Sequence, residues 1–305
     1  MSKNWLVTGA NGNLGRRLIT DLLARGAAVH ALVRSAAAQN IVQALAPGSG
    51  QLQVSVVDYE DAASLRAALD AADTLQGDTL AVVHLVGILK ETPNASYVAA
   101  HENSSTALTT ALGARPGQQV IYLSIVGSTP QAENACLASK GRAEQICLEH
   151  STGACVLRVP MVLGEGDYAS FALRKRASSR FAFNFRPASL EQPIYAGDVV
   201  QAIQAAAGGV QGAFDLGGPE VVTRRDLALR AAAILGTTHT TIGLPFALGA
   251  LVARCLERLS ANPPVTAAML DVLDHDDNVD IQPALDALEM DGLTPLNDML
   301  KAVLV

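Results

Sequence analysis

Three glycines near the start of the chain have the spacing of a phosphate-binding turn. Gly9, Gly12 and Gly15 follow a short apolar segment, residues 4–8, and precede an amphipathic helical pattern over residues 14–25. Such glycines permit a tight turn off the strand, a close backbone approach to a diphosphate and close packing of the helix. The N–H groups and the positive dipole end at the start of a helix attract the same ligand. We therefore predict a dinucleotide-binding turn, and a glycine-rich turn that holds no ligand is the alternative.

A second apolar segment, residues 28–33, is followed by Arg34 and Ser35, and these two residues bear on which dinucleotide binds. In NAD-binding versions of the motif, an acidic residue about 20 positions past the glycines accepts the ribose 2′-hydroxyl, whereas an arginine there suits a 2′-phosphate. Residues 29–40 contain no Asp or Glu, and Arg34 lies 19 residues after Gly15. The sequence therefore predicts NADP(H) in preference to NAD(H), with a solvated arginine as the alternative.

Strands and helical patterns alternate through the first half of the chain, which predicts an α/β fold with a parallel, doubly wound sheet and helices on both faces. The expected strands cover residues 4–8, 28–33, 53–58, 80–87, 119–124 and 154–158, and the expected helices cover residues 14–25, 62–72, 96–112 and 136–150. Ligands of such sheets bind outside the carboxyl ends of the strands. We therefore expect Asp58 and Tyr59 beside the adenine, and Leu85, Val86 and Gly87 beside the ribose and phosphates. From the glycine turn we add Asn11, Asn13 and Leu14.

The later part of the chain has a looser pattern. We expect a dinucleotide-binding domain over residues 1–165, to which residues 190–220 return, and a smaller, mostly helical substrate region over 166–189 and 221–305. Residues 195–207 form an expected helix, and Thr223 is an expected N-cap for a helix that reaches residue 235. The apolar run over residues 242–253 is too short to span a bilayer and contains Pro245 and Gly249. It predicts a core or dimer helix, with a membrane-surface helix as the alternative.

Residues 171–186 stand out because they contain five basic residues and four phenylalanines but no acid. Basic and aromatic side chains in alternation can bind anionic or base-like ligands. A lid or helix with a solvated basic face and buried phenylalanines is the interpretation that we favour.

Composition limits the class of protein. The net charge of −7 argues against a general nucleic-acid binder, and 50% hydrophobic residues over 305 positions suffice for a large core. The four cysteines have no CxxC spacing, so we expect neither a metal site nor a disulfide scaffold. A strand that begins by about residue 4 leaves no room for a signal peptide, and we expect a cytoplasmic protein without a transmembrane segment.

Several short motifs together resemble one family. They are Thr-Gly-Ala-Asn-Gly-Asn-Leu-Gly at 8–15, Leu-Val-Arg at 32–34, His-Leu-Val-Gly-Ile-Leu at 84–89, Tyr-Leu-Ser at 122–124, Leu-Gly-Gly-Pro-Glu at 216–220 and Asp-Asn-Val at 277–279. The chain resembles the extended and atypical short-chain dehydrogenase/reductases over nearly its whole length. Within them it is most similar to bacterial relatives of the nucleotide-binding accessory subunit of respiratory complex I. The resemblance implies a Rossmann-type fold and adds Val159 and Met161 to the expected cofactor-binding residues.

Active members of this family use a Tyr-x-x-x-Lys pair and a serine at the end of the fifth strand. Ser124 and Lys140 stand at the matching positions, but Cys136 stands where the tyrosine would be. The phenol normally exchanges a proton with the substrate oxygen while hydride moves. A cysteine has a shorter reach, although proton transfer from Cys136 remains a candidate. Lys140 would hold the nicotinamide ribose with or without catalysis.

Three functions fit these residues. The first is an NADP(H)-dependent oxidoreductase acting on a small carbonyl or alcohol, or on a quinone-like substrate, with Ser124, Cys136 and Lys140 as catalytic residues. The second is a non-catalytic NADPH-binding module, structural or redox-sensing, within a larger complex. The third is a sugar-nucleotide epimerase or dehydratase, which needs the same missing tyrosine. A homodimer also fits the fold.

Overall fold

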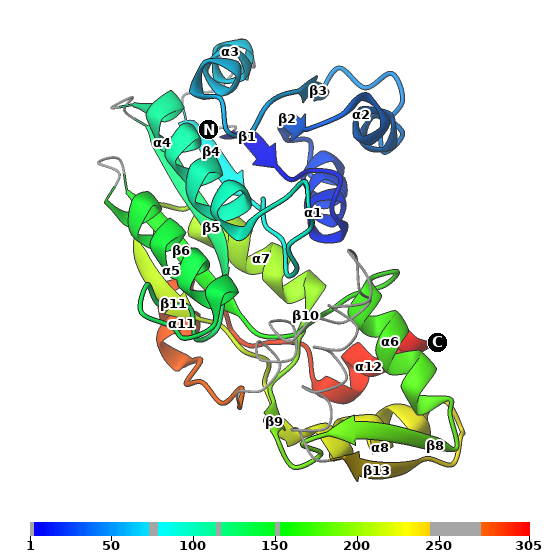
Figure 1. Cartoon of the computed structure of the whole chain (residues 1–305). Coiled ribbons are helices and arrows are strands. Elements are labelled where there is room, and N and C mark those ends of the chain that lie inside the picture. Colours follow the sequence, from blue (N-terminus) through cyan, green and yellow to red (C-terminus); the bar gives the residue numbers. More distant parts are fainter. Residues whose placement is uncertain (1–2, 73–78, 114–116, 150–152, 245–275) are drawn as a thin grey trace.

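A parallel sheet is the centre of the computed structural model, which describes residues 3–72, 79–113, 117–149, 153–244 and 276–305 (Figure 1). Within these residues seven strands lie in the order β11-β6-β5-β4-β1-β2-β3, and every neighbouring pair is parallel. The strands are β1 (Lys3–Thr8), β2 (Ala28–Val33), β3 (Leu52–Val56), β4 (Thr79–His84), β5 (Gln118–Ile125), β6 (Ala154–Val159) and β11 (Gly212–Asp215). The predicted α/β class with a doubly wound sheet is confirmed.

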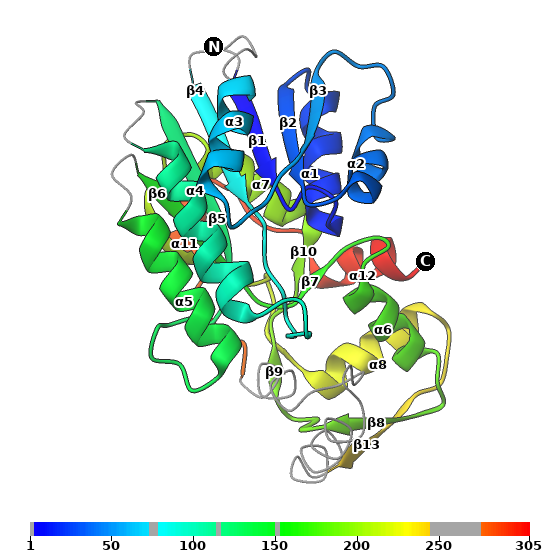
Figure 2. The same cartoon turned by 45° about the horizontal axis from the view of Figure 1, so that its top comes forward.

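Helices cover both faces of the sheet because its strands are apolar on both sides. Along β1, Val7 faces the core under α1 (Asn13–Ala24) and α7 (Ala196–Ala206), whereas Leu6 faces the opposite core. The first face also carries α2 (Ala36–Gln43) and α11 (Gln282–Ala287). The second face carries α3 (Ala62–Ala72), α4 (Ser104–Leu112) and α5 (Ala135–Leu148), which follow one another along one side of the molecule in Figure 2.

The strand order reverses between β1 and β4. From β1 the chain builds outward to β2 and β3, and it then crosses back to place β4 on the other side of β1. In doubly wound sheets the ligand crevice lies at this switch point, outside the carboxyl ends of the strands. Here those ends are followed by Gly9 and Leu85, which is where the sequence predicts the cofactor.

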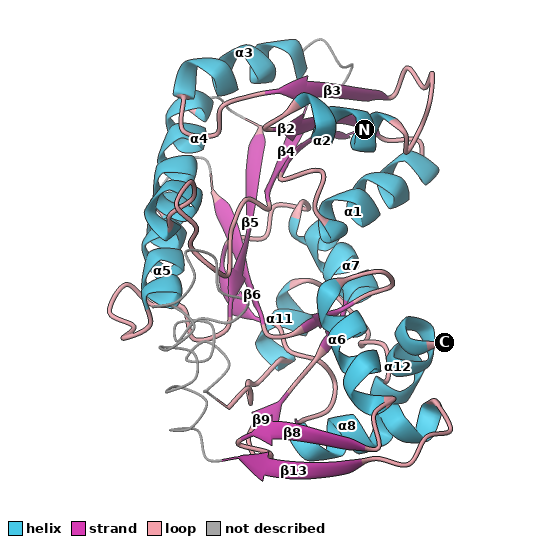
Figure 3. Cartoon of the chain, turned by 45° about the vertical axis from the view of Figure 1, so that its right-hand side comes forward, coloured by secondary structure: helices cyan, strands magenta, loops and turns pink. Residues whose placement is uncertain are grey.

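The smaller C-terminal region has its own core. Helices α6 (Tyr168–Ala177), α8 (Arg224–Ile234) and α12 (Leu296–Leu304) share one apolar cluster at the end of the molecule opposite β3 (Figure 3). Short strand pairs accompany them: β7 (Val162–Leu163) with β10 (Ile194–Tyr195), β9 (Leu190–Glu191) with β12 (Val222–Thr223), and β8 (Phe181–Phe185) with β13 (Thr240–Leu244). Thr223 caps α8 as predicted, because its side chain accepts the N–H of Asp226.

Some predicted elements differ from the observed ones. The third strand ends at Val56, so Asp58 and Tyr59 lie in the following turn. The helix expected from residue 96 begins as a π-helical segment, η1 (Val98–Asn103). Helix α2 was not predicted, although Ser35 caps it by accepting the N–H of Ala38.

The basic, phenylalanine-rich segment is not one helix, and two of its four phenylalanines are exposed. It forms the end of α6 and the strand β8, and Phe171 and Phe181 are 62% and 57% exposed. That part of the prediction was wrong, because the core under α6 is filled by its other residues, Ser170, Leu173 and Ala177. In the apolar run over 242–253, residues 242–244 belong to β13, and the remainder lies outside the described residues.

Candidate functional site

The turn between β1 and α1 requires glycine at two positions. Gly9 has φ +66°, and a Cβ there would lie 2.9 Å from the backbone carbon of Leu85. A Cβ on Gly15 would lie 2.7 Å from the carbonyl oxygen of Gly9. Gly15 therefore lets the helix fold closely against the turn itself. Within the turn, the Gly12 N–H donates to the Gly9 carbonyl at 3.0 Å.

The start of α1 is open to an anion. No side chain caps the helix at Gly12, and its first turn contains no acidic residue. Asn11 and Gly12 are exposed, while Asn13 and Leu14 are half-buried. The first N–H groups of a helix have no partner within it, and they carry the positive end of its dipole. The turn therefore fits a diphosphate.

Tyr59 anchors this turn to the neighbouring strand. Its hydroxyl accepts the Gly9 N–H at 2.8 Å and donates to the Leu32 carbonyl at 2.6 Å. Burial raises the pKa of Tyr59 to about 12, and the nearby charge of Arg34 lowers it only in part. The phenol is thus a neutral bridge between backbone groups. The expected contact between Tyr59 and the adenine of the cofactor stays a prediction.

Arg34, Ser35 and Asp58 lie at the carboxyl ends of two paired strands, β2 and β3. Arg34 and Asp58 are exposed, as a residue that meets a ligand must be. Ser35 caps α2, and one carboxylate oxygen of Asp58 accepts the N–H of Glu60 at 2.9 Å. The guanidinium of Arg34 is therefore the positive charge that this corner offers to a phosphate.

Lys140 is buried under the end of β4. Its ammonium Nζ donates to the Leu123 carbonyl at 2.9 Å and lies 4.6 Å from the centre of the Tyr122 ring. A Cβ on Gly87 would lie 3.0 Å from Nζ, so the glycine makes room for the ammonium. Burial lowers the pKa of Lys140 to about 8. Ser124, next along β5, is 2% exposed, and its hydroxyl has no hydrogen-bond partner among the described residues.

Cys136 lies at the start of α5 and is 0% exposed. Its Sγ donates to the Ile88 carbonyl at 3.7 Å, and its side chain packs against Tyr97. Burial raises the pKa of the thiol to about 11, although Lys140 lowers it in part. The thiol is therefore neutral at physiological pH and faces the backbone of the loop after β4.

Sequence reasoning missed His101 and Tyr97, which complete this site. A Cβ on Gly87 would lie 3.5 Å from His101 Nε2. The rings of Tyr97 and His101 stack with their centroids 5.7 Å apart. Burial lowers the pKa of His101 to about 3, so the ring is neutral. No sequence motif joins this position to Lys140. The π-helical turn that contains His101 is a feature often found at functional sites, but it is visible only in the structure.

Glu102 holds that turn against α5. Its carboxylate accepts from Ser139 at 2.8 Å and from two nitrogens of Arg142 at 2.8 and 2.9 Å. These bonds fix η1 beside Lys140, because both partners lie on α5. Further along the same edge of the sheet, Val159 ends β6 and is buried, and Met161 follows it half-buried.

Comparisons with known proteins agree with this geometry. Residues 9–143 match a family of NAD(P)H-binding domains. Over 264 residues the chain is 26% identical to the Arabidopsis thaliana mitochondrial protein NADH dehydrogenase [ubiquinone] 1 alpha subcomplex subunit 9, covering 81% of this chain. The chain spans 61% of the length of that subunit.

Solved structures of epimerases share the fold. The UDP-glucuronic acid 4-epimerase of Bacillus cereus, in complex with NAD, has a TM-score of 0.71 at 18% identity, over 99% of this chain and 97% of its own. The UDP-N-acetylglucosamine 4-epimerase of the same organism has a TM-score of 0.68 at 16% identity, over 98% and 96%.

The fold and the glycine turn together define an NAD(P)-binding protein of the doubly wound class. The matched domain, the likeness to the complex I subunit and the shared epimerase fold agree with the predicted resemblance to the extended and atypical short-chain dehydrogenase/reductases. Among its described helices, none has the length and apolar character needed to cross a bilayer. The described residues also contain no cluster of side chains suited to a metal ion.

Proposed function

We propose that this protein binds NADP(H) and holds it as a structural or redox-sensing ligand. The observation that carries the proposal is the uncapped, acid-free start of α1, together with the exposed Arg34 that follows the neighbouring strand β2. Three phosphates of NADP(H) need compensating charge and hydrogen bonds, and this corner supplies both kinds. An acid at the end of β2 would repel the 2′-phosphate, and no acidic residue follows that strand before residue 40.

Each part of the cofactor has a candidate partner. The amide groups of Asn13 and Leu14 would bind the diphosphate, and Arg34 with Ser35 would bind the 2′-phosphate. Asp58 would meet the adenine, and Lys140 would donate to the nicotinamide ribose. The remaining candidates line the walls of the same crevice: Gly9, Asn11, Gly12, Gly15, Tyr59, Leu85, Val86, Gly87, Val159 and Met161. NADP(H), when bound, supplies a transferable hydride.

The position of Cys136 favours binding over turnover. Carbonyl reduction needs a group that gives a proton to the substrate oxygen as hydride arrives. The thiol is fully buried, donates to the Ile88 carbonyl and has a raised pKa, so it is poorly placed for this task. The neighbouring Tyr97 donates its own hydroxyl to the Leu89 carbonyl at 3.0 Å.

An oxidoreductase acting on a small carbonyl, alcohol or quinone-like compound is the second candidate. The Ser124 hydroxyl favours this candidate, because it has no hydrogen-bond partner among the described residues. Ser124 follows Leu123, whose carbonyl accepts a hydrogen bond from Lys140. Ser124 would polarise the substrate oxygen. An epimerase or dehydratase is less favoured because it depends on the missing tyrosine, and the likeness to epimerases is one of fold.

Purification followed by a turnover assay separates these candidates. We expect the protein to bind NADPH tightly and to show no NADPH oxidation with a panel of quinones, aldehydes and ketones. Turnover that is lost in Cys136→Ala would overturn the module and assign the thiol a catalytic role. Turnover that survives Cys136→Ala but is lost in Ser124→Ala would support the second candidate. A Cys136→Tyr variant that gains turnover would show that the rest of the site is arranged for reduction.

Membership of a larger assembly is part of the proposal. It rests on the likeness to a subunit of NADH dehydrogenase, and it suits a chain that holds a cofactor without turnover. A homodimer is the alternative arrangement. A cytoplasmic location stays a prediction.

A further inference from the structure

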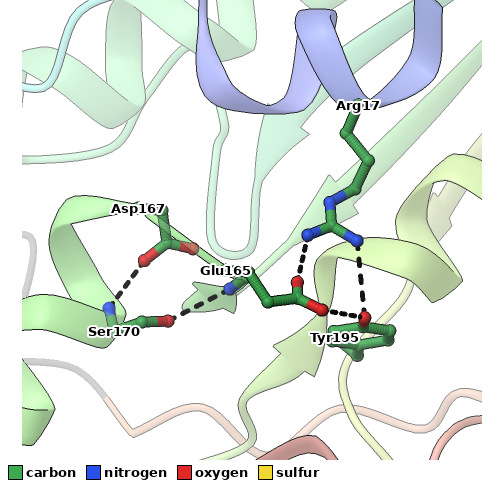
Figure 4. Close-up of polar contacts among 6 residues, drawn as sticks. Arg17, Glu165, Asp167, Ser170 and Tyr195 are labelled. Carbon is green, nitrogen blue, oxygen red and sulfur yellow. Dashed lines mark hydrogen bonds and ion pairs between the residues drawn. The ribbon is translucent and has the colours of Figure 1, made fainter. Parts of the chain in front are cut away.

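A charged cluster links the helix after the glycine turn to the C-terminal region. Arg17 extends from α1 to the carboxylate of Glu165, which follows β7, and to the hydroxyl of Tyr195, which ends β10 (Figure 4). Tyr195 in turn donates to the second oxygen of Glu165 at 2.7 Å. One carboxylate thus receives a hydrogen bond at each oxygen from residues far apart in the chain.

The cluster lies at the edge of the sheet where ligands bind. β7 begins shortly after β6 ends, and it pairs in parallel with β10. Arg17 is four residues after Asn13, so the two side chains share one face of α1. Arg17 is therefore one helical turn after the residues whose backbone N–H groups would bind the diphosphate.

Two of the three residues are held in place without Glu165. The Arg17 guanidinium lies 5.5 Å from the centre of the Tyr195 ring, an attractive cation–π arrangement. A Cβ on Gly197 would lie 2.4 Å from that ring, so the glycine makes room for it. The guanidinium and the phenol would keep their arrangement if the carboxylate left.

Glu165 itself is placed so that it can move. It lies between Gly164, where a Cβ would lie 2.7 Å from Ala196 Cβ, and Gly166, where a Cβ would meet no atom within 4 Å, so the open space is on the Gly166 side. Its side chain is 45% exposed, against 25% for Arg17, and exposed ion pairs contribute little to stability. The neighbouring acid, Asp167, instead caps α6, where one of its oxygens accepts the Ser170 N–H at 2.6 Å (Figure 4).

We propose that Arg17 and Tyr195 form an anion-binding subsite, which the carboxylate of Glu165 fills in this structure and which takes a phosphate or carboxylate group of a ligand bound in the crevice. Glu165 acts as an internal competitor for this subsite. An arginine fork with a phenol donor matches the paired oxygens of either anion. The anion has two sources: the diphosphate of the cofactor, or an acidic group on a separate ligand.

Calorimetric titration with inorganic phosphate tests this subsite. Glu165→Ala removes the competitor, and we expect it to bind phosphate about tenfold or more tightly than the unmodified protein. Glu165→Gln keeps the size of the side chain and should show the same direction of change, which guards against a folding defect in the alanine variant. Adding Arg17→Gln to either variant should abolish the gain.

Glu220→Ala is the matched control. It frees Arg230 from an ion pair of similar exposure, for which no cation–π contact is found among the described residues, and it should gain no phosphate affinity. Equal affinity in Glu165→Ala, Glu220→Ala and the unmodified protein would overturn the proposal, as would a gain that survives Arg17→Gln. These titrations do not require NADPH, so they can fail independently of the proposed function.

A second titration of Glu165→Ala, with NADPH at saturation, identifies the source of the anion. Loss of phosphate binding would assign the subsite to the cofactor's diphosphate. Phosphate that still binds would assign it to a separate anionic ligand.

Discussion

The hydroxyl of Tyr59 lies 2.8 Å from the backbone nitrogen of Gly9 and accepts its hydrogen. Through a second bond to the Leu32 carbonyl, one side chain ties the end of β1 to the end of β2. Tyr59, which we expect beside the adenine, therefore supports the turn that would hold the diphosphate. The shape of this turn depends on a residue fifty positions away in the chain.

Tyr59→Phe removes this support. We expect the free energy of unfolding to fall by about 1–3 kcal/mol, because the Gly9 N–H loses its acceptor in a half-buried position. NADPH affinity should fall as well. Urea denaturation followed by circular dichroism measures the first effect. Tyr168→Phe is the control, since Tyr168 is 81% exposed. Equal losses in the two variants would contradict the structural role.

Gly9→Ala should damage the turn more severely. The residue has φ +66°, and its new Cβ would lie 2.9 Å from the backbone of Leu85. Left-handed backbone alone costs a non-glycine residue about 1–2 kcal/mol, and the clash adds to this. We expect lower stability and loss of NADPH binding. Gly50→Ala is the matched change, because a Cβ there meets nothing within 4 Å, and retained NADPH binding in Gly9→Ala would oppose our reading of the turn.

Acid should destabilise the protein through its buried histidines. Burial lowers the pKa of His84 and His101 from 6.5 to about 3 in the folded chain. The unfolded chain binds the extra protons first, so the stability that these residues provide is complete above about pH 6.5 and is lost as the pH falls toward 3. At about pH 5 the loss is about 2 kcal/mol for each histidine.

Urea denaturation at about pH 7 and pH 5 measures this loss. In His84→Gln the free energy of unfolding should fall less between about pH 7 and pH 5, by about 2 kcal/mol, because the amide cannot take up the proton. The amide can still bond Thr8, whose Oγ1 lies 2.8 Å from His84 Nδ1. An unchanged difference would show that His84 does not titrate on unfolding.

Local patterns were sufficient to predict six of the seven strands of the sheet. The strand over 28–33 has the predicted bounds because it is apolar throughout and ends at Arg34, and the helix over 62–72 likewise matches α3. The helix expected over 14–25 also ends as α1 does, because Gly26, directly after the C-cap Arg25, has φ +78°. These features are set by neighbours in the sequence.

The missed parts of the site depend on contacts between distant segments. His101 meets Lys140 only because α5 packs beside η1, and nothing in the spacing of the two residues indicates this. Arg17 and Tyr195 are separated by 178 positions. Phe171 and Phe181 were expected to be buried because they are apolar, but their exposure depends on which face of α6 and β8 meets the core.

The dissociation constants of NADPH and NADH, measured for the unmodified protein and for Arg34→Ala, test the central claim most directly. Our account predicts that NADPH binds the unmodified protein about tenfold or more tightly than NADH, because a charged hydrogen bond contributes about 1.5–3 kcal/mol. Arg34→Ala should remove most of this difference and leave NADH binding unchanged, while Arg25→Ala, which removes the ion pair with Asp21 on α1, should change neither. Equal affinities for the two cofactors in the unmodified protein would contradict the account.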